Sequence, residues 1–246
     1  MPQTASDTMN AETVAPPQDH RTRVAAERRE RMRARLYDSA LELVARGGPA
    51  ALTIDEVIVQ AEVSRGTFYK YFDRPESLLR DLAIELAEEL VRTAEPLVLA
   101  HSDPAQRLST GMRTVIGLGV AQPSIGAFIV RMGWPAVDRQ HAMFEFALRD
   151  LEAGLAIGRF LPLPPALGVN IVSSTVIGAM HALLFDAAGP AFPAQATAAA
   201  LRALGVEPAQ AERIAAVPLD TPAPIAGGLM ARCAALALNA APAPPS

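Results

Sequence analysis

The sequence contains one cysteine, Cys233, and few aromatic residues, which make up 5% of its 246 positions. A single cysteine excludes an internal disulfide and a cysteine-based zinc site within one chain, and it is typical of a reducing compartment. We interpret Cys233 as a buried apolar side chain. Sustained runs of alternating β-branched residues are also absent, whereas half of the residues are apolar. The composition therefore predicts an all-α fold with a substantial core.

Long apolar runs and a secretion signal are missing as well. The N-terminal residues include Asp7, Glu12 and Asp19 and no apolar run of the kind that secretion signals carry. The most apolar stretch, residues 171–185, is interrupted by Ser, Thr and His and is shorter than a membrane span requires. We therefore expect a cytoplasmic protein with no membrane partner.

The motifs of common catalytic sites do not occur in the sequence. It has no G-x-S-x-G, no H-E-x-x-H, no Gly-rich phosphate loop and no EF-hand run. His141 and Glu145 have the i, i+4 spacing of two metal ligands on one helix face, but a surface pair or a salt bridge is the commoner cause of that spacing. We predict that the protein is not an enzyme and needs neither a cofactor nor a metal.

The formal net charge of −4 conceals a basic segment near the N-terminus. Residues 20–35 contain seven Arg and two Glu. Such an excess is found on ordinary solvated helix faces and also on arms that follow a phosphate backbone. Its position just before the polar and aromatic stretch EVSRGTFYKYF favours the second interpretation.

Capping residues divide the first ninety positions into short elements. We predict a tail over residues 1–26 and a first helix from about Glu27 to Arg46. Thr53 caps a second helix, with Glu56 as its capping-box partner, and Ser64 caps a third. Asp73 and Glu76 mark the start of a fourth helix, with Pro75 in its first turn. Two short helices joined by a tight turn predict a helix-turn-helix.

The third helix separates into two faces. Phe68 and Phe72 fall on one side and point back at the first two helices. The other side offers a guanidinium for base edges and hydroxyl and ammonium groups for phosphates. A surface helix whose Tyr and Lys cover the edges of the core is the competing interpretation. The candidate DNA-contacting residues are Thr53, Ser64, Arg65, Gly66, Thr67, Tyr69, Lys70, Tyr71 and Arg74.

Residues 28–90 resemble the N-terminal DNA-binding domain of the TetR family of bacterial transcriptional regulators. The resemblance is carried by ALELVARGGPAALTIDEVIVQAEVSRGTFYKYFDRPESLL, in particular by its VS-x-G-T-F-Y-x-Y-F recognition helix. It implies base contacts from Arg65, Gly66 and Thr67, phosphate contacts from Tyr69, Lys70 and Tyr71, and an Arg-rich start that lies beside or across the minor groove. It also implies a homodimer on a palindromic operator, released by a small effector, and a repressor by family tendency.

Three residues depart from the family pattern. Glu62 replaces a Gly in the turn, where we expect a left-handed backbone and a cost of roughly 1 kcal/mol. Ile58 replaces a small Ala, and Pro75 replaces a Lys, so one phosphate contact is lost unless Arg74 supplies it. These departures motivate an alternative, a ligand- or protein-binding dimer of the same fold that has lost specific DNA binding.

The rest of the chain is predicted to be a larger helical domain. We expect residues 27–90 to form the DNA-binding domain and residues 91–246 the ligand-binding and dimerisation domain. Two segments, about 165–188 and 222–240, are apolar nearly all round, which predicts a helix pair that meets its copy in a four-helix interface. Most of the candidate pocket side chains are apolar, which favours an apolar effector. Candidate pocket residues are His101, Arg113, Phe128, Met132, Trp134, His141, Met143 and Phe144.

Overall fold

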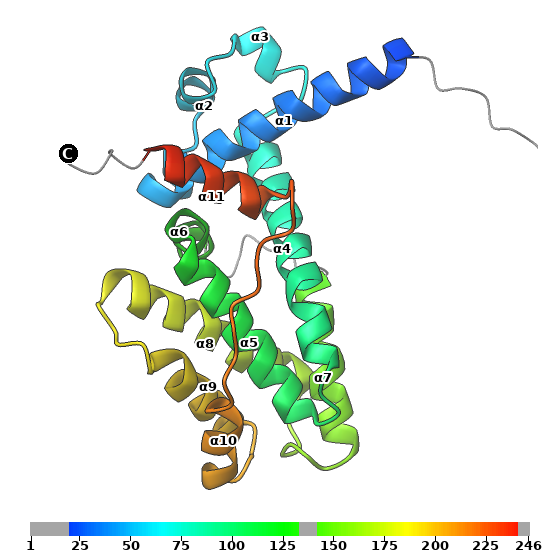
Figure 1. The fold of residues 1–246 in the computed structure, drawn as a ribbon, viewed down its shortest axis with the longest axis vertical. Coiled ribbons are helices and arrows are strands. Elements are labelled where there is room, and N and C mark those ends of the chain that lie inside the picture. Colours follow the sequence, from blue (N-terminus) through cyan, green and yellow to red (C-terminus); the bar gives the residue numbers. More distant parts are fainter. Residues whose placement is uncertain (1–19, 133–141, 241–246) are drawn as a thin grey trace, which may run out of the picture.

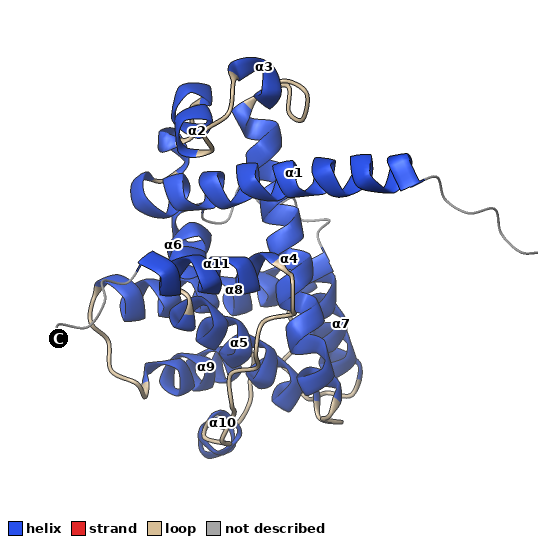
Figure 2. Cartoon of the chain, turned by 45° about the horizontal axis from the view of Figure 1, so that its top comes forward, coloured by secondary structure: helices blue, strands red, loops and turns tan. Residues whose placement is uncertain are grey.

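A computed structural model describes residues 20–132 and 142–240 of the chain. Within these ranges the chain forms eleven α-helices and one short 3-10 helix, and no strand (Figures 1 and 2). The predicted all-α class is confirmed. A small group of helices at the top of Figure 1 is joined by one long helix to a larger bundle below it.

The small group consists of α1 (His20–Gly47), η1 (Pro49–Ala51), α2 (Ile54–Gln60) and α3 (Arg65–Phe68). Its core includes Leu36, Tyr37, Val57, Phe68 and Phe72, each at most 5% exposed. The predicted tail over residues 1–26 is wrong from His20 onward, because α1 begins there. Its first turns bury nothing, so the apolar spacing that marks a helix in the sequence begins only further along.

The long helix α4 (Pro75–Leu99) leaves the small group and runs down the side of the bundle (Figure 1). Pro75 occupies its first turn as predicted, but the N-cap is Arg74. Asp73 accepts a hydrogen bond from the Ser77 hydroxyl instead of capping the helix. The predicted domain boundary near residue 90 falls inside α4, and the core cluster of the small group continues into Phe128 and Met132 of the bundle.

Six further helices form the bundle. They are α5 (Pro104–Ala121), α6 (Pro123–Met132), α7 (Ala142–Ala156), α8 (Pro165–Phe185), α9 (Phe192–Ala203) and α10 (Pro208–Ala215). Helix α5 packs against α4, α6, α7, α8 and α9, so it is the centre of the bundle. Its inward residues Leu108 and Met112 join Leu151 and Leu201 in a second core cluster.

The last helix, α11 (Leu229–Ala240), lies across α1, α4 and α6 (Figures 1 and 2). Leu229 and Met230 are fully buried against these helices, and Cys233 is 8% exposed. The carboxylate of Glu89 on α4 accepts from the Met230 backbone N–H at 3.3 Å. The predicted pairing of segments 165–188 and 222–240 is therefore wrong: α11 begins at Leu229 and covers its apolar face within its own chain, away from α8.

Helix α8 lies within the predicted apolar segment 165–188. It begins at Pro165, and over its 21 residues it is the one described helix long and apolar enough to cross a membrane; α5 and α6 pass the same test only together, across a bend of 116°. The expectation that this stretch is too short for a span is thus corrected. Since α8 packs against α5, α6, α7 and α9, its composition is that of a bundle helix.

Candidate nucleic-acid interface and buried cavity

Two side-chain caps fix the helix-turn-helix. The Thr53 hydroxyl accepts from the Glu56 N–H at 3.2 Å and starts α2, and the Ser64 hydroxyl accepts from the Thr67 N–H at 3.1 Å and starts α3. Regular α-helix ends at Phe68, but the backbone continues as tight turns, with the Phe72 N–H donating to the Phe68 carbonyl at 3.0 Å. The third helix thus ends before Phe72, earlier than the predicted helical spacing of Phe68 and Phe72 requires.

The two faces of α3 lie as the sequence predicts. Phe68 is fully buried and Phe72 is 5% exposed, and the Phe72 ring lies 6.0 Å from that of Tyr37 on α1. Most candidate DNA-contacting residues are on the outside. Thr53, Ser64, Arg65, Gly66, Tyr69, Lys70 and Arg74 are exposed, whereas Thr67 and Tyr71 are half-buried. Tyr71 packs its ring partly against the core, so only its edge is available to a partner.

Gly66 is not required by the packing of its own chain. A Cβ built there would meet only the Ser64 hydroxyl, at 3.9 Å. A helical glycine costs about 1 kcal/mol relative to alanine. The absence of an internal reason favours close approach by an external partner at this point.

Two acidic residues pair with arginines on this surface, and the sequence analysis did not anticipate either pair. The Glu62 carboxylate accepts from Arg35 of α1 at 2.7 Å, and Asp55 of α2 pairs with Arg65. Glu62 has φ of 49°, so the predicted left-handed backbone is confirmed. The partners are 27 and 10 residues apart in the sequence, so helical spacing could not pair them without the geometry of the turns.

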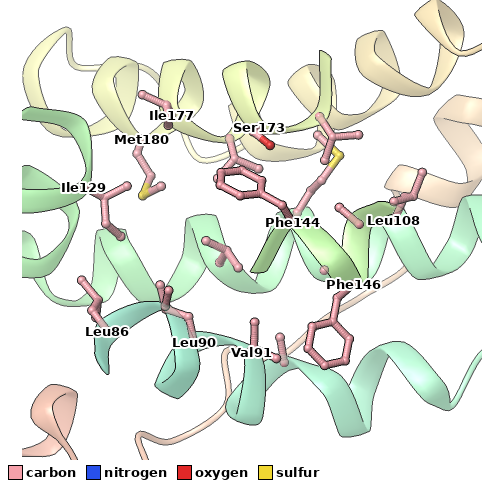
Figure 3. A pocket seen from close by; sticks show the side chains of 18 of the residues that line it. Leu86, Leu90, Val91, Leu108, Ile129, Phe144, Phe146, Ser173, Ile177 and Met180 are labelled. Carbon is pink, nitrogen blue, oxygen red and sulfur yellow. The ribbon is translucent and has the colours of Figure 1, made fainter. Parts of the chain in front are cut away.

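A cavity of about 160 Å³ lies between α4, α5, α6, α7 and α8 (Figure 3). Its wall is almost entirely apolar, with Leu86 and Leu90 from α4 facing Ile177 and Met180 from α8. Of the candidate pocket residues, Phe128, Met132 and Phe144 line it. Phe146 joins them.

The polar candidates are placed elsewhere. Arg113 donates to the Val217 carbonyl at 2.6 Å, outside the cavity, and burial lowers its pKa. His101 lies in the loop after α4, where its carbonyl accepts from Arg107 at 2.8 Å. Neither lines the cavity, so both predictions are wrong. Trp134, His141 and the side chain of Met143 lie outside the described part of the chain.

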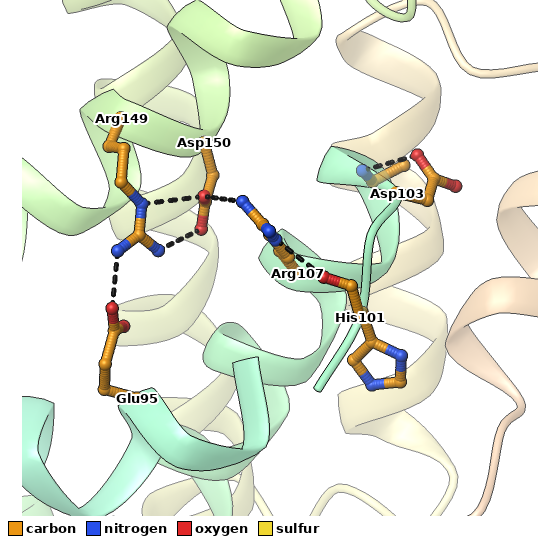
Figure 4. A network of polar contacts seen from close by, with 7 residues as sticks. Glu95, His101, Asp103, Arg107, Arg149 and Asp150 are labelled. Carbon is orange, nitrogen blue, oxygen red and sulfur yellow. Dashed lines mark hydrogen bonds and ion pairs between the residues drawn. The ribbon is translucent and has the colours of Figure 1, made fainter. Parts of the chain in front are cut away.

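The polar end of the cavity comes from residues that the sequence analysis missed (Figure 4). Asp150, 3% exposed, accepts from Arg149 twice at 3.0 Å and from Arg107 at 3.5 Å. Arg149 also donates to Glu95 at 2.5 Å. The hydrogen bond to Asp150 raises the pKa of Arg149. Asp150, Arg107, Glu95 and Ser173 are the polar residues of the lining. In the sequence, only the adjacent residues Arg149 and Asp150 indicate a network of this kind.

Metal chemistry finds no support in the described ranges. No group of three or more His, Cys, Asp or Glu side chains lies close enough there to hold an ion.

Comparison with known proteins decides the family. The model of bacterial regulatory proteins of the tetR family matches residues 36–82, and the model of the tetracyclin repressor-like C-terminal domain matches residues 103–217. The crystal structure of RolR in complex with resorcinol is 30% identical, covers 80% of this chain and 100% of its own, and superposes with a TM-score of 0.64. The chain belongs to the TetR family of bacterial transcriptional regulators.

Two further relatives are less similar to this chain. FadR of Bacillus subtilis in complex with stearoyl-CoA is 17% identical, with a TM-score of 0.55 over 69% of this chain and 96% of its own, and shares the fold. An uncharacterised HTH-type transcriptional regulator of Mycobacterium tuberculosis is 28% identical over 105 residues, 43% of this chain. The chain spans about half the length of this curated relative, 52%. The TetR assignment makes α2 and α3 the helix-turn-helix of a DNA-binding regulator.

Proposed function

We propose that this TetR-family protein is a cytoplasmic homodimeric repressor that binds a palindromic operator and is released by a small hydroxylated aromatic compound. The observation that carries the proposal is the path of α4. Its Leu78 and Leu82 belong to the core under the helix-turn-helix, and its Leu86 and Leu90 line the cavity. A ligand in the cavity therefore touches the helix on which the recognition helix rests.

The DNA-contacting roles rest on exposure and chemistry. Arg65, at the N-terminus of α3, has the bidentate donors that suit a guanine edge. Tyr69 is 51% exposed beside Lys70, and both donate to phosphates. We assign Arg65, Gly66 and Thr67 to base edges, and Thr53, Tyr69, Lys70 and Arg74 to the backbone.

The homodimer interface is assigned to α8. One face of this helix is exposed along its whole length and presents Leu167, Ser174, Gly178, His181 and Phe185. Leu167 and Phe185 remain 49% and 45% exposed, and small residues lie between them. A face of this kind suits close contact with a second copy, in keeping with the isologous dimers common among regulators. Since α11 is engaged elsewhere, we place α8 and its neighbour α9 alone at the interface.

The cavity sets the size of the effector. An engineered apolar cavity of about 150 Å³ accepts benzene, so about 160 Å³ accommodates one ring. A long acyl chain with a coenzyme A head, as in the FadR complex, is far larger. RolR was crystallised with resorcinol, a single ring with two hydroxyls.

The polar end sets the chemistry of the effector. A carboxylate has about four acceptor sites, and three of those on Asp150 are taken by arginine donors. The fourth is available to a ring hydroxyl. Arg107 offers donors to a second hydroxyl, and the remaining wall is apolar. We therefore assign a phenol or dihydroxybenzene as the effector class.

DNA binding is tested by titrating the protein with duplexes from upstream of its own gene at two salt concentrations. Arg65→Ala is expected to relax preference at particular base pairs, whereas Tyr69→Ala weakens binding to every duplex. Binding that never exceeds that to random DNA would favour the alternative, a dimer of this fold without specific DNA binding. Two ion pairs favour this alternative, Arg35 with Glu62 and Arg65 with Asp55, because each pair occupies a guanidinium group that could otherwise contact DNA.

Effector binding is tested by calorimetry with resorcinol, with benzene as the apolar probe. Asp150→Asn should weaken resorcinol about tenfold or more and leave benzene unchanged, since a hydrogen bond to a charged group contributes roughly 1.5–3 kcal/mol. Glu152→Gln, an exposed acid on the same helix, is the matched control. Ala147→Phe places a ring inside the cavity and should abolish the binding of both resorcinol and benzene. Unimpaired binding by Ala147→Phe would place the ligand elsewhere.

The dimer is tested by sedimentation. Gly178→Arg should yield a monomer, because a Cβ at Gly178 meets nothing of its own chain within 4 Å and the fold tolerates it. Ala156→Arg, exposed at the end of α7, is the control. A dimer that survives Gly178→Arg would exclude the α8 interface.

A further inference from the structure

The first turns of α1 extend beyond the other described helices. In both overall views the N-terminal part of α1 projects sideways from the molecule, at the same end as α3 (Figures 1 and 2). Residues 22–31 are all exposed. At a rise of 1.5 Å per residue, the segment from residue 22 to Arg35 is about 20 Å long. Its exposed part, residues 22–31, is too polar for a core helix and buries nothing within the chain.

The arginines of this segment are not spread evenly around the helix. Arg28 is seven residues before Arg35, which places it on nearly the same face, and Arg31 is four residues before Arg35 and adjacent to it. Glu30 is five residues before Arg35, or roughly 140° away. Glu27 pairs with Arg23 at 3.7 Å. One face of α1 is therefore rich in arginine: Glu30 lies away from it, and Glu27, four residues before Arg31, is paired with Arg23.

The contact of Arg35 with Glu62 orients this cationic face. Glu62 lies in the turn that leads into the recognition helix, and Arg35 reaches it at 2.7 Å. Arg28 and Arg31 thus continue, along α1, the side of the molecule on which the helix-turn-helix turn lies. Arg33 faces the other way, since it donates to the Tyr37 hydroxyl at 2.8 Å and pairs with Glu85 of α4 at 3.9 Å.

We propose that Arg28 and Arg31 form a second DNA-contacting surface, which binds backbone phosphates of the duplex flanking the segment read by α3, while Arg35 stays paired with Glu62. This proposal rests on the operator binding proposed above and names a further part of that interface. The occupant is duplex DNA because the surface carries two neighbouring guanidinium groups, its nearest acid on the helix, Glu27, is paired with Arg23, and it has no exposed aromatic cluster.

The helical form determines which part of the DNA is contacted. A helix with side chains is about 10–12 Å wide, whereas the minor groove is about 6 Å wide. The expected arm across the minor groove is therefore replaced by a helix beside it, on the phosphates. Because the segment is already helical, little backbone entropy is lost on binding. Its length of about 20 Å corresponds to roughly six base pairs of flanking duplex at 3.4 Å each.

The test compares two duplexes that share a selectively bound core from upstream of the gene, one with flanks of ten base pairs or more and one trimmed to the core. Arg28→Gln/Arg31→Gln should bind the long duplex about tenfold more weakly than the natural chain and the trimmed duplex within twofold. The salt slope should fall by about 1.8 per subunit, for two lost phosphate contacts at 0.9 each. Arg202→Gln/Arg213→Gln, two exposed arginines of α9 and α10, is the matched control.

Equal losses on both duplexes, or no loss on either, would overturn the proposal. A duplex of random sequence distinguishes the second surface from the proposed regulator function. On this duplex the salt slope of binding must also fall in the Arg28/Arg31 variant, because phosphate contacts do not depend on sequence. An unchanged slope contradicts the second surface even where operator binding is intact. A reduced slope without any selective binding by the natural chain supports the surface and contradicts the regulator.

Discussion

The ion pair of Glu62 and Arg35 joins the turn between α2 and α3 to the first helix, α1. Their side chains meet at 2.7 Å, while Glu62 holds a left-handed backbone with φ of 49°. The pair is exposed, at 82% for Glu62 and 45% for Arg35, so its contribution to stability is at most about 1 kcal/mol. A non-glycine residue in this conformation costs a similar amount. The pair therefore offsets strain that glycine would avoid.

Replacing Glu62 separates strain from charge. Glu62→Gly removes both the strain and the ion pair and should match or exceed the natural chain in free energy of unfolding, by up to about 1 kcal/mol. Glu62→Ala keeps the strain and should be the less stable of the two. Both variants release Arg35, so the salt slope of DNA binding should rise by about 0.9 per subunit. Urea unfolding and DNA titration measure the two effects; a Gly variant less stable than the Ala variant would contradict the account of strain.

Glu89 fixes α11 to α4. Its carboxylate is 1% exposed and both oxygens accept from the Met230 N–H at the start of α11. Glu89→Gln removes the negative charge from a helix N-terminus and turns one acceptor into a donor, so we expect a loss of about 1–3 kcal/mol in the free energy of unfolding. Chemical denaturation measures it. Glu88→Gln, on the exposed side of α4, should change stability by less than about 0.5 kcal/mol.

Cys233 reports whether α11 stays docked. Burial raises the pKa of its thiol to about 12, so at pH 8 almost no thiolate is present. Iodoacetamide at pH 8 should label the native protein far more slowly than a free cysteine and should label the urea-unfolded protein fully. Glu89→Gln should accelerate labelling of the native protein. Labelling at the rate of a free thiol in the native chain would show that α11 is not docked in solution.

Asp103 makes stability depend on pH. Hydrogen bonds from Arg159, at 2.9 and 3.0 Å, hold the pKa of Asp103 below its ordinary value of 3.8. A carboxyl whose folded pKa is depressed adds stability above its unfolded pKa and loses it as pH falls through the folded one. Asp103→Asn should thus cost about 1–2 kcal/mol at pH 7, and the difference should shrink below about pH 4. Thermal unfolding across pH measures it; a constant difference would assign the effect to the cap on Ala105 instead.

Residues close together in the chain were predictable because local rules govern them. Thr53 and Ser64 cap helices through hydrogen bonds within three residues, and Pro75 fits a first turn because its missing N–H is not needed there. Phe68 and Phe72 face inward by helical spacing. Even the left-handed turn at Glu62 followed from the motif. The cap predicted at Asp73 was wrong by one residue, because the Asp73 carboxylate accepts from the Ser77 hydroxyl instead of capping the helix.

The sequence by itself determined the all-α class, the helix-turn-helix and the division of α3 into a core face and an exposed face, since each depends on local spacing. Only the tertiary structure decided what meets across helices. It brought Arg107, Glu95 and Asp150 to one end of the cavity, took Arg113 away from it, and placed α11 over α1 and α4 rather than beside α8. An apolar helix has the same periodicity whichever neighbour buries it, so its partner is fixed by the packing of the whole chain.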